Sequence, residues 1–142
     1  MQNKTRQRGF TLLEILVVIS IIGILVALGT AAFSTTQKKS RDARRKADIK
    51  ALQNGFEQFH SKEGAYPTTL LEANDTTIFP SGLPSDPRGT GENIYTINLS
   101  ADEFCACALL ESSVGNAAAL PDGGATTCSY GSGDYYCLGN LQ

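Results

Sequence analysis

The strongest pattern in the chain is an apolar stretch near its N-terminus. Residues 10–33, FTLLEILVVISIIGILVALGTAAF, contain a single charged side chain, Glu14. A helix of this length is about 36 Å long, which is enough to cross the roughly 30 Å hydrocarbon core of a bilayer. The pattern therefore predicts a membrane-spanning helix over residues 10–33.

The helical pattern continues beyond the apolar stretch. Residues 34–62 consist mainly of good helix formers and contain no proline. Four apolar side chains recur there at spacings of three and four: Ile49, Leu52, Phe56 and Phe59. This spacing places them along one face of a helix, which we expect to pack on a small sheet. Gly64 followed by Pro67 predicts the end of the helix.

The last part of the chain has the pattern of a small β-rich domain. Turn-forming residues at 83–89 precede an alternating run at 95–99, and a less regular alternation covers 103–109. A third strand is expected around residues 134–138. Together these patterns predict an α+β fold, in which one long N-terminal helix packs by its second half on a small antiparallel β-sheet.

These patterns divide the chain into four segments. We expect a basic leader peptide at 1–9, a transmembrane helix at 10–33, an amphipathic helix at 34–62 and a β-rich head at 63–142. The total of 142 residues leaves room for one globular domain. The head of such a chain must therefore be small.

Charge is distributed unevenly along these segments, although the net charge is only −2. The leader contains three basic side chains and no acidic one. Residues 38–50 contain seven basic and two acidic side chains, and the chain from residue 51 onward contains two basic and eleven acidic ones. This separation indicates different surroundings for the leader, the helix and the head.

Four cysteines lie in the last third of the chain: Cys105, Cys107, Cys128 and Cys137. They lack C-x-x-C spacing, and the chain has one histidine, so a zinc site is not favoured. An even number of cysteines in a small domain is typical of disulfides formed in an oxidising compartment. If 103–109 is a strand, Cys105 and Cys107 face the same side. We then expect each to pair with one of the other two, while the connectivity itself stays open.

The apolar stretch begins within a distinctive string, RGFTLLE at residues 8–14. The string resembles the prepilin processing motif of type IV pilins and type II secretion pseudopilins. The resemblance implies that a prepilin peptidase cuts between Gly9 and Phe10 on the cytoplasmic side and that Phe10 is then N-methylated. It also implies that Glu14 pairs with the N-terminal amine of a neighbouring subunit. An ordinary signal peptide has a shorter apolar region that ends in an A-x-A-like site, and a plain anchor leaves the Glu14 carboxylate unexplained. The resemblance makes residues 10–33 the filament-core helix.

The resemblance implies a structural subunit of a helical filament, either a type IV pilus or a type II secretion pseudopilus. Its expected partners are identical and related pilin subunits, the prepilin peptidase and methyltransferase, the inner-membrane assembly platform and membrane lipids. The alternative is a membrane-anchored extracytoplasmic binding module, for DNA or sugar for example, that does not polymerise. Electron microscopy of sheared surface material separates these two hypotheses.

The resemblance also implies a location. The precursor is expected to cross the inner, cytoplasmic membrane once with its head outside the cytoplasm, and later to form a periplasmic or extracellular filament. The count of basic residues on either side of the span would by itself place the head in the cytoplasm. The cysteines and the cleavage motif favour the opposite orientation, which we adopt.

The basic side chains of residues 38–50 follow the apolar stretch directly. We expect them to contact lipid head groups or acidic surfaces of neighbouring subunits. A solvated helix face is the alternative. The segment lacks the interleaved aromatic side chains of single-strand binders, so it does not favour nucleic acid.

The chain offers few residues for catalysis or for a cofactor. Its one histidine is His60, and it contains no phosphate-binding glycine loop, no G-x-S-x-G and no H-E-x-x-H motif. We therefore expect no enzyme activity. Asp122 and Asp134 lie in glycine-rich segments that could supply oxygen ligands. Too few acidic residues are grouped there to predict a calcium site, so calcium stays open and no cofactor is expected.

Overall fold

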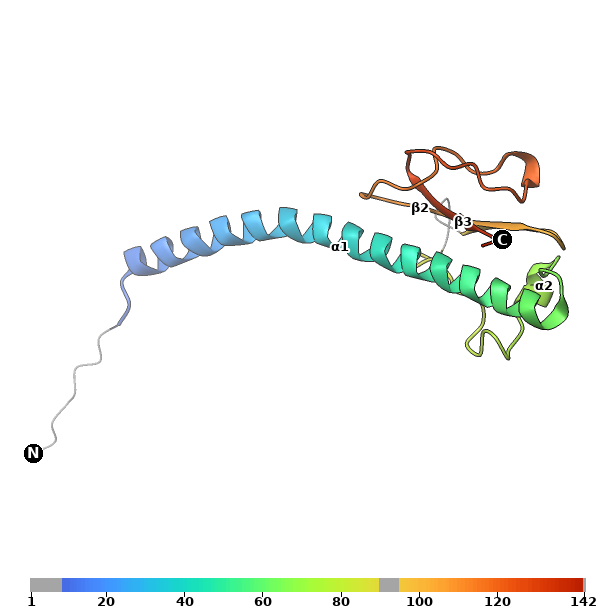
Figure 1. Ribbon diagram of the computed structural model, residues 1–142. Coiled ribbons are helices and arrows are strands. Elements are labelled where there is room, and N and C mark those ends of the chain that lie inside the picture. The colour runs from blue at the N-terminus through green and yellow to red at the C-terminus, as the bar shows by residue number, and fades with distance from the viewer. Residues whose placement is uncertain (1–8, 90–94, 142) are drawn as a thin grey trace, which may run out of the picture. The chain divides into compact units, whose positions relative to one another are not determined.

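The structure is a computed structural model that describes residues 9–89 and 95–141 (Figure 1). The elements follow in the order α1 (Leu12–Glu63), α2 (Leu70–Ala73), β1 (Thr96–Leu99), β2 (Phe104–Leu109), the short 3-10 helix η1 (Asp122–Gly124) and β3 (Tyr135–Gly139). The predicted α+β class, with a long N-terminal helix and a small antiparallel sheet, is confirmed. The basic side chains of the leader, at positions 4, 6 and 8, lie outside the described residues.

The chain divides into two compact units, one up to Thr36 and one from Gln37 onward. The first unit contains the N-terminal part of α1, and its described side chains are all exposed. The second unit contains the rest of α1, α2 and all three strands. The predicted core and sheet therefore belong to the second unit. From here on, the word head means this whole unit, which includes the C-terminal part of α1 in addition to the head expected at 63–142.

The core of the head forms around the C-terminal part of α1. Its predicted apolar face is confirmed, because Ile49, Leu52 and Phe56 are fully buried and Phe59 is nearly so. The Phe56 ring makes an edge-on contact with the ring of Phe104, with 5.0 Å between the centroids. Aromatic pairs favour this arrangement, in which the edge of one ring meets the face of another.

Helix α1 ends where the sequence predicts. Gly64 follows its last residue with φ of 81°, a left-handed conformation that glycine adopts without a steric cost. The Gly64 amide donates to the carbonyl of His60 at 2.8 Å, which satisfies one of the last free carbonyls of the helix. Tyr66 then turns into the core, and its hydroxyl donates to Glu57 at 3.1 Å.

The three predicted strands form one antiparallel sheet in the order β1-β2-β3. Strand β2 is central and almost fully buried. Its even-numbered residues, such as Phe104 and Ala106, pack in the core with α1, whereas Cys105 and Cys107 lie in a second cluster on the opposite face. This alternation follows from the two-residue period of a strand.

The chain between β2 and β3 covers the cysteine face of the sheet. The side chain of Asn116 acts there like a neighbouring strand, because it donates to the carbonyl of Cys137 at 2.8 Å and accepts from the amide of Cys137 at 2.7 Å. Gly115 lies so close to the backbone of Tyr135 that a Cβ atom would overlap it. The glycine at position 115 therefore allows the backbone of the loop to pack closely against the backbone of β3.

Candidate functional site

The residues of the predicted processing site precede the helix. Gly9 and Phe10 are exposed and not helical, and α1 begins at Leu12. The Phe10 side chain is 85% exposed. A peptide bond in an open, non-helical segment, next to a residue without a side chain, is accessible to a peptidase.

Glu14 lies in the first turn of α1 and forms a capping box with Thr11. The backbone amide and the hydroxyl of Thr11 both donate to Glu14 Oε2 at 2.8 Å, and the Glu14 amide donates back to the Thr11 hydroxyl at 3.2 Å. This arrangement satisfies free amides at the start of the helix. Our sequence reasoning missed the role of Thr11, although Thr11-Leu12-Leu13-Glu14 has the T-x-x-E spacing that signals it.

The N-terminal part of α1 presents an uncovered apolar surface. Its large apolar side chains are at least 46% exposed, from Phe10 to Phe33. The hydroxyls of Ser20 and Thr30 donate to carbonyls of the helix itself, so they need no outside partner. The helix is long and apolar enough to cross a membrane. An apolar surface of this extent indicates a lipid or protein environment.

A cluster of charged side chains connects α1 to two loops of the head. Arg45 is fully buried, and its guanidinium group reaches three carboxylates: Asp86 at 2.6 Å, Glu111 at 2.9 Å and Asp42 at 3.3 Å. Arg41 binds Glu111 through two parallel hydrogen bonds of 2.6 and 2.7 Å. Bidentate pairs of this kind are among the stronger hydrogen bonds in proteins.

Asp42 holds the loop that follows β2. Its carboxylate accepts hydrogen bonds from the backbone amides of Glu111, Ser112 and Ser113 at 2.8 to 2.9 Å. The hydroxyl of Ser112 also donates to it, at 3.0 Å. Burial alone would raise the pKa of Asp42, but these donors outweigh burial and hold the pKa below its usual value. Asp42 is therefore a charged anchor for the loop.

The hydrogen bonds from Arg41 lower the pKa of Glu111 to about 2, and those from Arg45 add to the effect.

We expected the basic side chains of residues 38–50 to find partners outside the chain. For Arg45 that expectation is wrong, because it is buried among carboxylates of its own head. Two of its acidic partners, Asp86 and Glu111, were missed because they lie more than 40 positions further along the chain.

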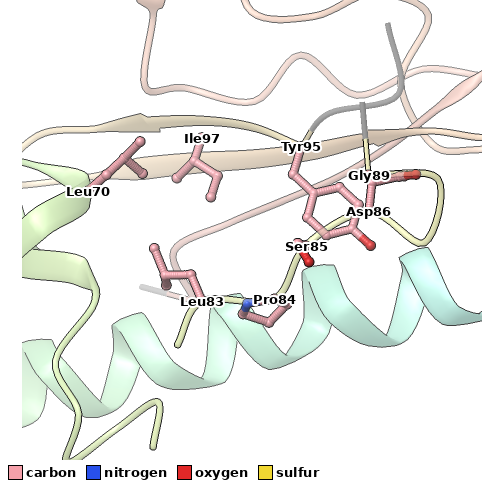
Figure 2. A pocket seen from close by; sticks show the side chains of 8 residues that line it. All are labelled: Leu70, Leu83, Pro84, Ser85, Asp86, Gly89, Tyr95 and Ile97. Carbon is pink, nitrogen blue, oxygen red and sulfur yellow. The ribbon is translucent and has the colours of Figure 1, made fainter. Parts of the chain in front are cut away.

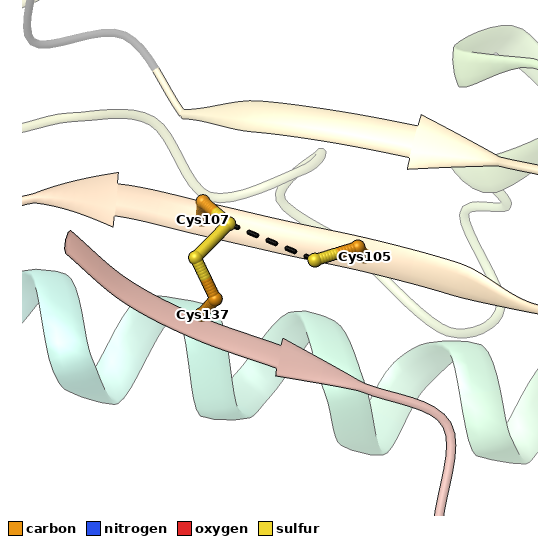
Figure 3. A group of neighbouring side chains, drawn as sticks. All are labelled: Cys105, Cys107 and Cys137. Carbon is orange, nitrogen blue, oxygen red and sulfur yellow. Dashed lines mark hydrogen bonds between the residues drawn. A yellow bond between two sulfur atoms is a disulfide. The ribbon is translucent and has the colours of Figure 1, made fainter. Parts of the chain in front are cut away.

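The four cysteines form two disulfides, Cys105–Cys128 and Cys107–Cys137. The sulfur atoms of Cys105 and Cys107 lie 3.7 Å apart on the same face of β2 (Figure 3). Within residues 9–89 and 95–141, Cys105, Cys107 and Cys137 are the one group close enough to hold a metal ion. All three sulfurs are in disulfides, so they offer no thiolate to a metal.

The two acidic residues considered for calcium are both exposed. Asp122 is an exposed residue of η1, and Asp134 is exposed just before β3. Neither belongs to a group of potential metal ligands in the part of the chain that the structure describes. A calcium ion prefers six to eight oxygen ligands, which these two residues do not gather.

The head also has a small pocket of about 260 Å³ beside β1. In Figure 2 the side chains of Tyr95 and Ile97 face those of Leu83 and Pro84 across it. Its acidic group, Asp86, already binds Arg45, and the Tyr95 hydroxyl donates to Asp48 at 2.7 Å. Burial and the neighbouring Asp48 raise the pKa of Tyr95. These polar groups are engaged in structural contacts within the head.

Comparison with known proteins shows which family shares these features. Residues 4–30 match the family model described as the prokaryotic N-terminal methylation motif. Type II secretion system core protein G of Aeromonas hydrophila is 34% identical over 101 residues, which are 71% of this chain and 70% of that protein. The core protein G of Escherichia coli K12 is 41% identical over 104 residues, 73% of this chain and 71% of that protein.

The chain belongs to the pilin and pseudopilin family. A type IV major pilin, PilA of Myxococcus xanthus, is 39% identical over 61 residues, which are 43% of this chain and 28% of that protein. No solved structure matches the chain. The predicted function, a structural subunit of a type IV pilus or a type II secretion pseudopilus, is thereby confirmed at that level.

Proposed function

We propose that the chain is a pseudopilin of the core protein G type, made as a membrane-inserted precursor. The similarity to core protein G carries this proposal, because it covers more than 70% of the chain and so extends beyond the N-terminal motif into the head. The similarity to the pilin PilA covers less than half of the chain. The type II secretion pseudopilus is therefore the filament that we favour.

The precursor is cut between Gly9 and Phe10, which removes the leader 1–9, and the new amino group of Phe10 is methylated. The exposure of both residues outside the helix supports this assignment. The new amine then pairs with Glu14 of a neighbouring subunit. A carboxylate within an apolar helix is costly unless a partner neutralises it, and each charge makes the other tolerable.

The capping box supports the role of Glu14. Thr11 holds Oε2 of the carboxylate at the first turn of α1, on the exposed surface of the helix. The carboxylate is thus presented at a defined depth, four residues after the new N-terminus. A pair formed at that depth sets the axial position of one subunit against the next.

Assembly brings the apolar parts of the helices together in the filament core, while the heads remain outside. Before assembly the precursor crosses the inner membrane once, with its head on the extracytoplasmic side. The two disulfides support that side, since such bonds form in oxidising compartments. The prepilin peptidase with its methyltransferase and the inner-membrane assembly platform are the expected partners, and the head has a structural role rather than an enzymatic one.

Mass spectrometry of the mature protein tests the processing step. We expect a chain that lacks residues 1–9 and carries one added methyl group on Phe10. An intact chain, or a chain cut at another bond, would refute the proposed cleavage.

Deletion of the gene tests which filament the chain builds. It should abolish protein secretion and leave surface pili intact; the reverse result would assign the chain to a pilus.

The substitution Glu14→Gln tests the assembly step. Glutamine retains an oxygen that can accept from Thr11, so the variant removes the charge and keeps the start of the helix. We expect normal cleavage and strongly reduced filament yield, measured by electron microscopy of sheared material. Ser20→Ala is the matched control, because the Ser20 hydroxyl donates to the carbonyl of Leu16 in its own helix. Normal filaments from Glu14→Gln would exclude the pairing role, and the absence of filaments from the wild-type protein would favour the anchored binding module.

A further inference from the structure

The basic segment at residues 38–50 separates into two sets of side chains. Most of its bases are used within the head. Arg41 pairs with Glu111, Arg45 pairs with the buried Asp86, and Arg44 approaches Asp48 at 3.8 Å. Lys46 lies over the ring of Tyr136 and Lys50 donates to Gln53 at 2.6 Å, which engages the last two bases of this set.

Lys38 and Lys39 form the second set. Both are exposed, and among the residues that the structure describes neither forms an ion pair or a hydrogen bond. They are adjacent on a helix, so their side chains leave its axis about 100° apart and cover more than one side of it. Two ammonium groups therefore project from adjacent sides of the helix at nearly one level, and no acidic group of the described residues pairs with them.

Their position along the helix indicates the surroundings of these lysines. Lys38 follows Phe33, the last large apolar residue of the stretch, by five residues, or about 7.5 Å along a helix. The polar layer of a bilayer extends roughly 5–8 Å beyond the hydrocarbon core on each side. A helix that buries residues 10–33 in the core thus places the backbone of Lys38 and Lys39 about 7.5 and 9 Å beyond its last buried residue. A flexible lysine side chain can reach the lipid phosphates from there.

We propose that Lys38 and Lys39 bind the phosphate groups of anionic phospholipids in the leaflet on the same side as the head. This inference rests on the proposed function, because it requires the membrane-inserted state. The long lysine stem can lie along the apolar edge of the span while its ammonium group reaches the phosphate. Phosphates are present all around a lone helix, which suits two lysines that point in different directions.

An acidic surface on a second copy of the chain fits these lysines less well. In the described part of the head no two exposed acidic residues are neighbours in the sequence; these residues are Glu63, Glu72, Asp102, Asp122 and Asp134. Two of them have partners already, since Glu63 pairs with Lys62 and Glu72 accepts from Thr68. The membrane-resident subunit also meets the lipid phosphates before it meets the head of a neighbour in the filament.

Lipid selectivity of the full-length chain tests the proposal. The protein is reconstituted into phosphatidylcholine vesicles that contain traces of spin-labelled phosphatidylglycerol or spin-labelled phosphatidylcholine. Electron spin resonance then gives the relative association of each lipid with the protein. We expect the wild type to prefer phosphatidylglycerol, and Lys38→Gln with Lys39→Gln to reduce this preference by about fivefold per lysine, the factor that corresponds to ~1 kcal/mol for a basic residue near an anionic surface.

Lys50→Gln with Lys62→Gln is the matched control. It removes the same charge from exposed lysines that lie about 18 and 36 Å further along the helix. The control should retain the preference for phosphatidylglycerol, and raised salt should suppress the preference of the wild type. An equal preference in the wild type and the Lys38/Lys39 variant would overturn the proposal. So would selective cross-links from these lysines to acidic head residues of a second copy.

The same preparation separates failure of this inference from failure of the proposed function. An alkaline wash of the vesicles shows whether the chain is inserted at all. If the wild type and both variants stay in the membrane and show no lipid preference, only the lysine assignment is wrong. If the wild type is washed off, the membrane-inserted precursor itself is refuted.

Discussion

Arg45 on α1 and Asp86 in the loop before β1 form a buried ion pair, with 2.6 Å between Nε and Oδ2. The two residues are 41 positions apart in the chain, and a second bond from the same guanidinium group reaches the other oxygen of Asp86 at 3.2 Å. The pair fastens the loop to the helix at the edge of the head. Because the pair is buried, we expect a substitution of either residue to lower the stability of the head more than a substitution of an exposed charged residue.

Asp86→Ala should lower the free energy of unfolding of the head by about 3–5 kcal/mol, because it leaves the charge of Arg45 buried with fewer partners. Urea denaturation of the full chain in detergent, followed by the near-ultraviolet signal of the head tyrosines, measures this loss. Asp102→Ala is the control, since Asp102 is exposed and should change stability little. Equal stability of Asp86→Ala and the wild type would show that the pair contributes nothing.

The stability of the head should depend on pH through Glu111. Its pKa falls from 4.5 to about 2 in the folded state because of Arg41 and Arg45. A carboxyl group with a lowered pKa stabilises the fold above its unfolded pKa, and this contribution is lost as the pH falls from about 4.5 toward 2. Glu111→Gln should be less stable at neutral pH and lose less stability over that range. Parallel curves for the two proteins would contradict this expectation.

Each disulfide should contribute roughly 2–4 kcal/mol to the stability of the head. The bonds join residues 23 and 30 positions apart, so the restriction of the unfolded chain is similar for both. Urea denaturation of Cys105→Ala with Cys128→Ala, and of Cys107→Ala with Cys137→Ala, measures the two contributions. The wild type under reducing conditions separates loss of the bonds from loss of the side chains. If neither double variant is destabilised, the bonds are not structural.

Gly55 should be needed for packing against Phe79. A Cβ atom built on Gly55 would overlap the ring of Phe79, which is itself buried. Gly55→Ala gains helix propensity of about 1 kcal/mol, but displacing a packed ring costs ~1–3 kcal/mol, so we expect a net loss of stability. Asn54→Ala is exposed and should be neutral or slightly stabilising. A stabilised Gly55→Ala would show that the ring moves at no cost.

Local patterns predicted the elements of the fold well. The spacing of Ile49, Leu52 and Phe56 identified the buried face of α1, and alternation identified strands close to the observed β1 and β2. Gly64 marked the end of α1 because a left-handed residue stops a helix. These features depend on neighbours within a few positions, which is why a single sequence reveals them.

The pairing of the cysteines could not be predicted from local patterns. Alternation placed Cys105 and Cys107 on one face of β2, but it could not say which partner each takes. The register of the sheet sets Cys107 directly opposite Cys137 and brings their Cα atoms within 4.1 Å, and Cys128 pairs with Cys105. A shift of the register would have changed these neighbours.

Sequence patterns alone predicted the apolar span, the prepilin-type string at residues 8–14 and the class of fold, because each depends on residues close together in the chain. The tertiary structure was needed to tell which basic side chains of residues 38–50 are buried and which are exposed. Arg45 and Lys38 look alike in a charge count, yet one is enclosed by carboxylates and the other is exposed. That difference depends on loops 41 to 70 residues away, and packing of the head brings them to the helix.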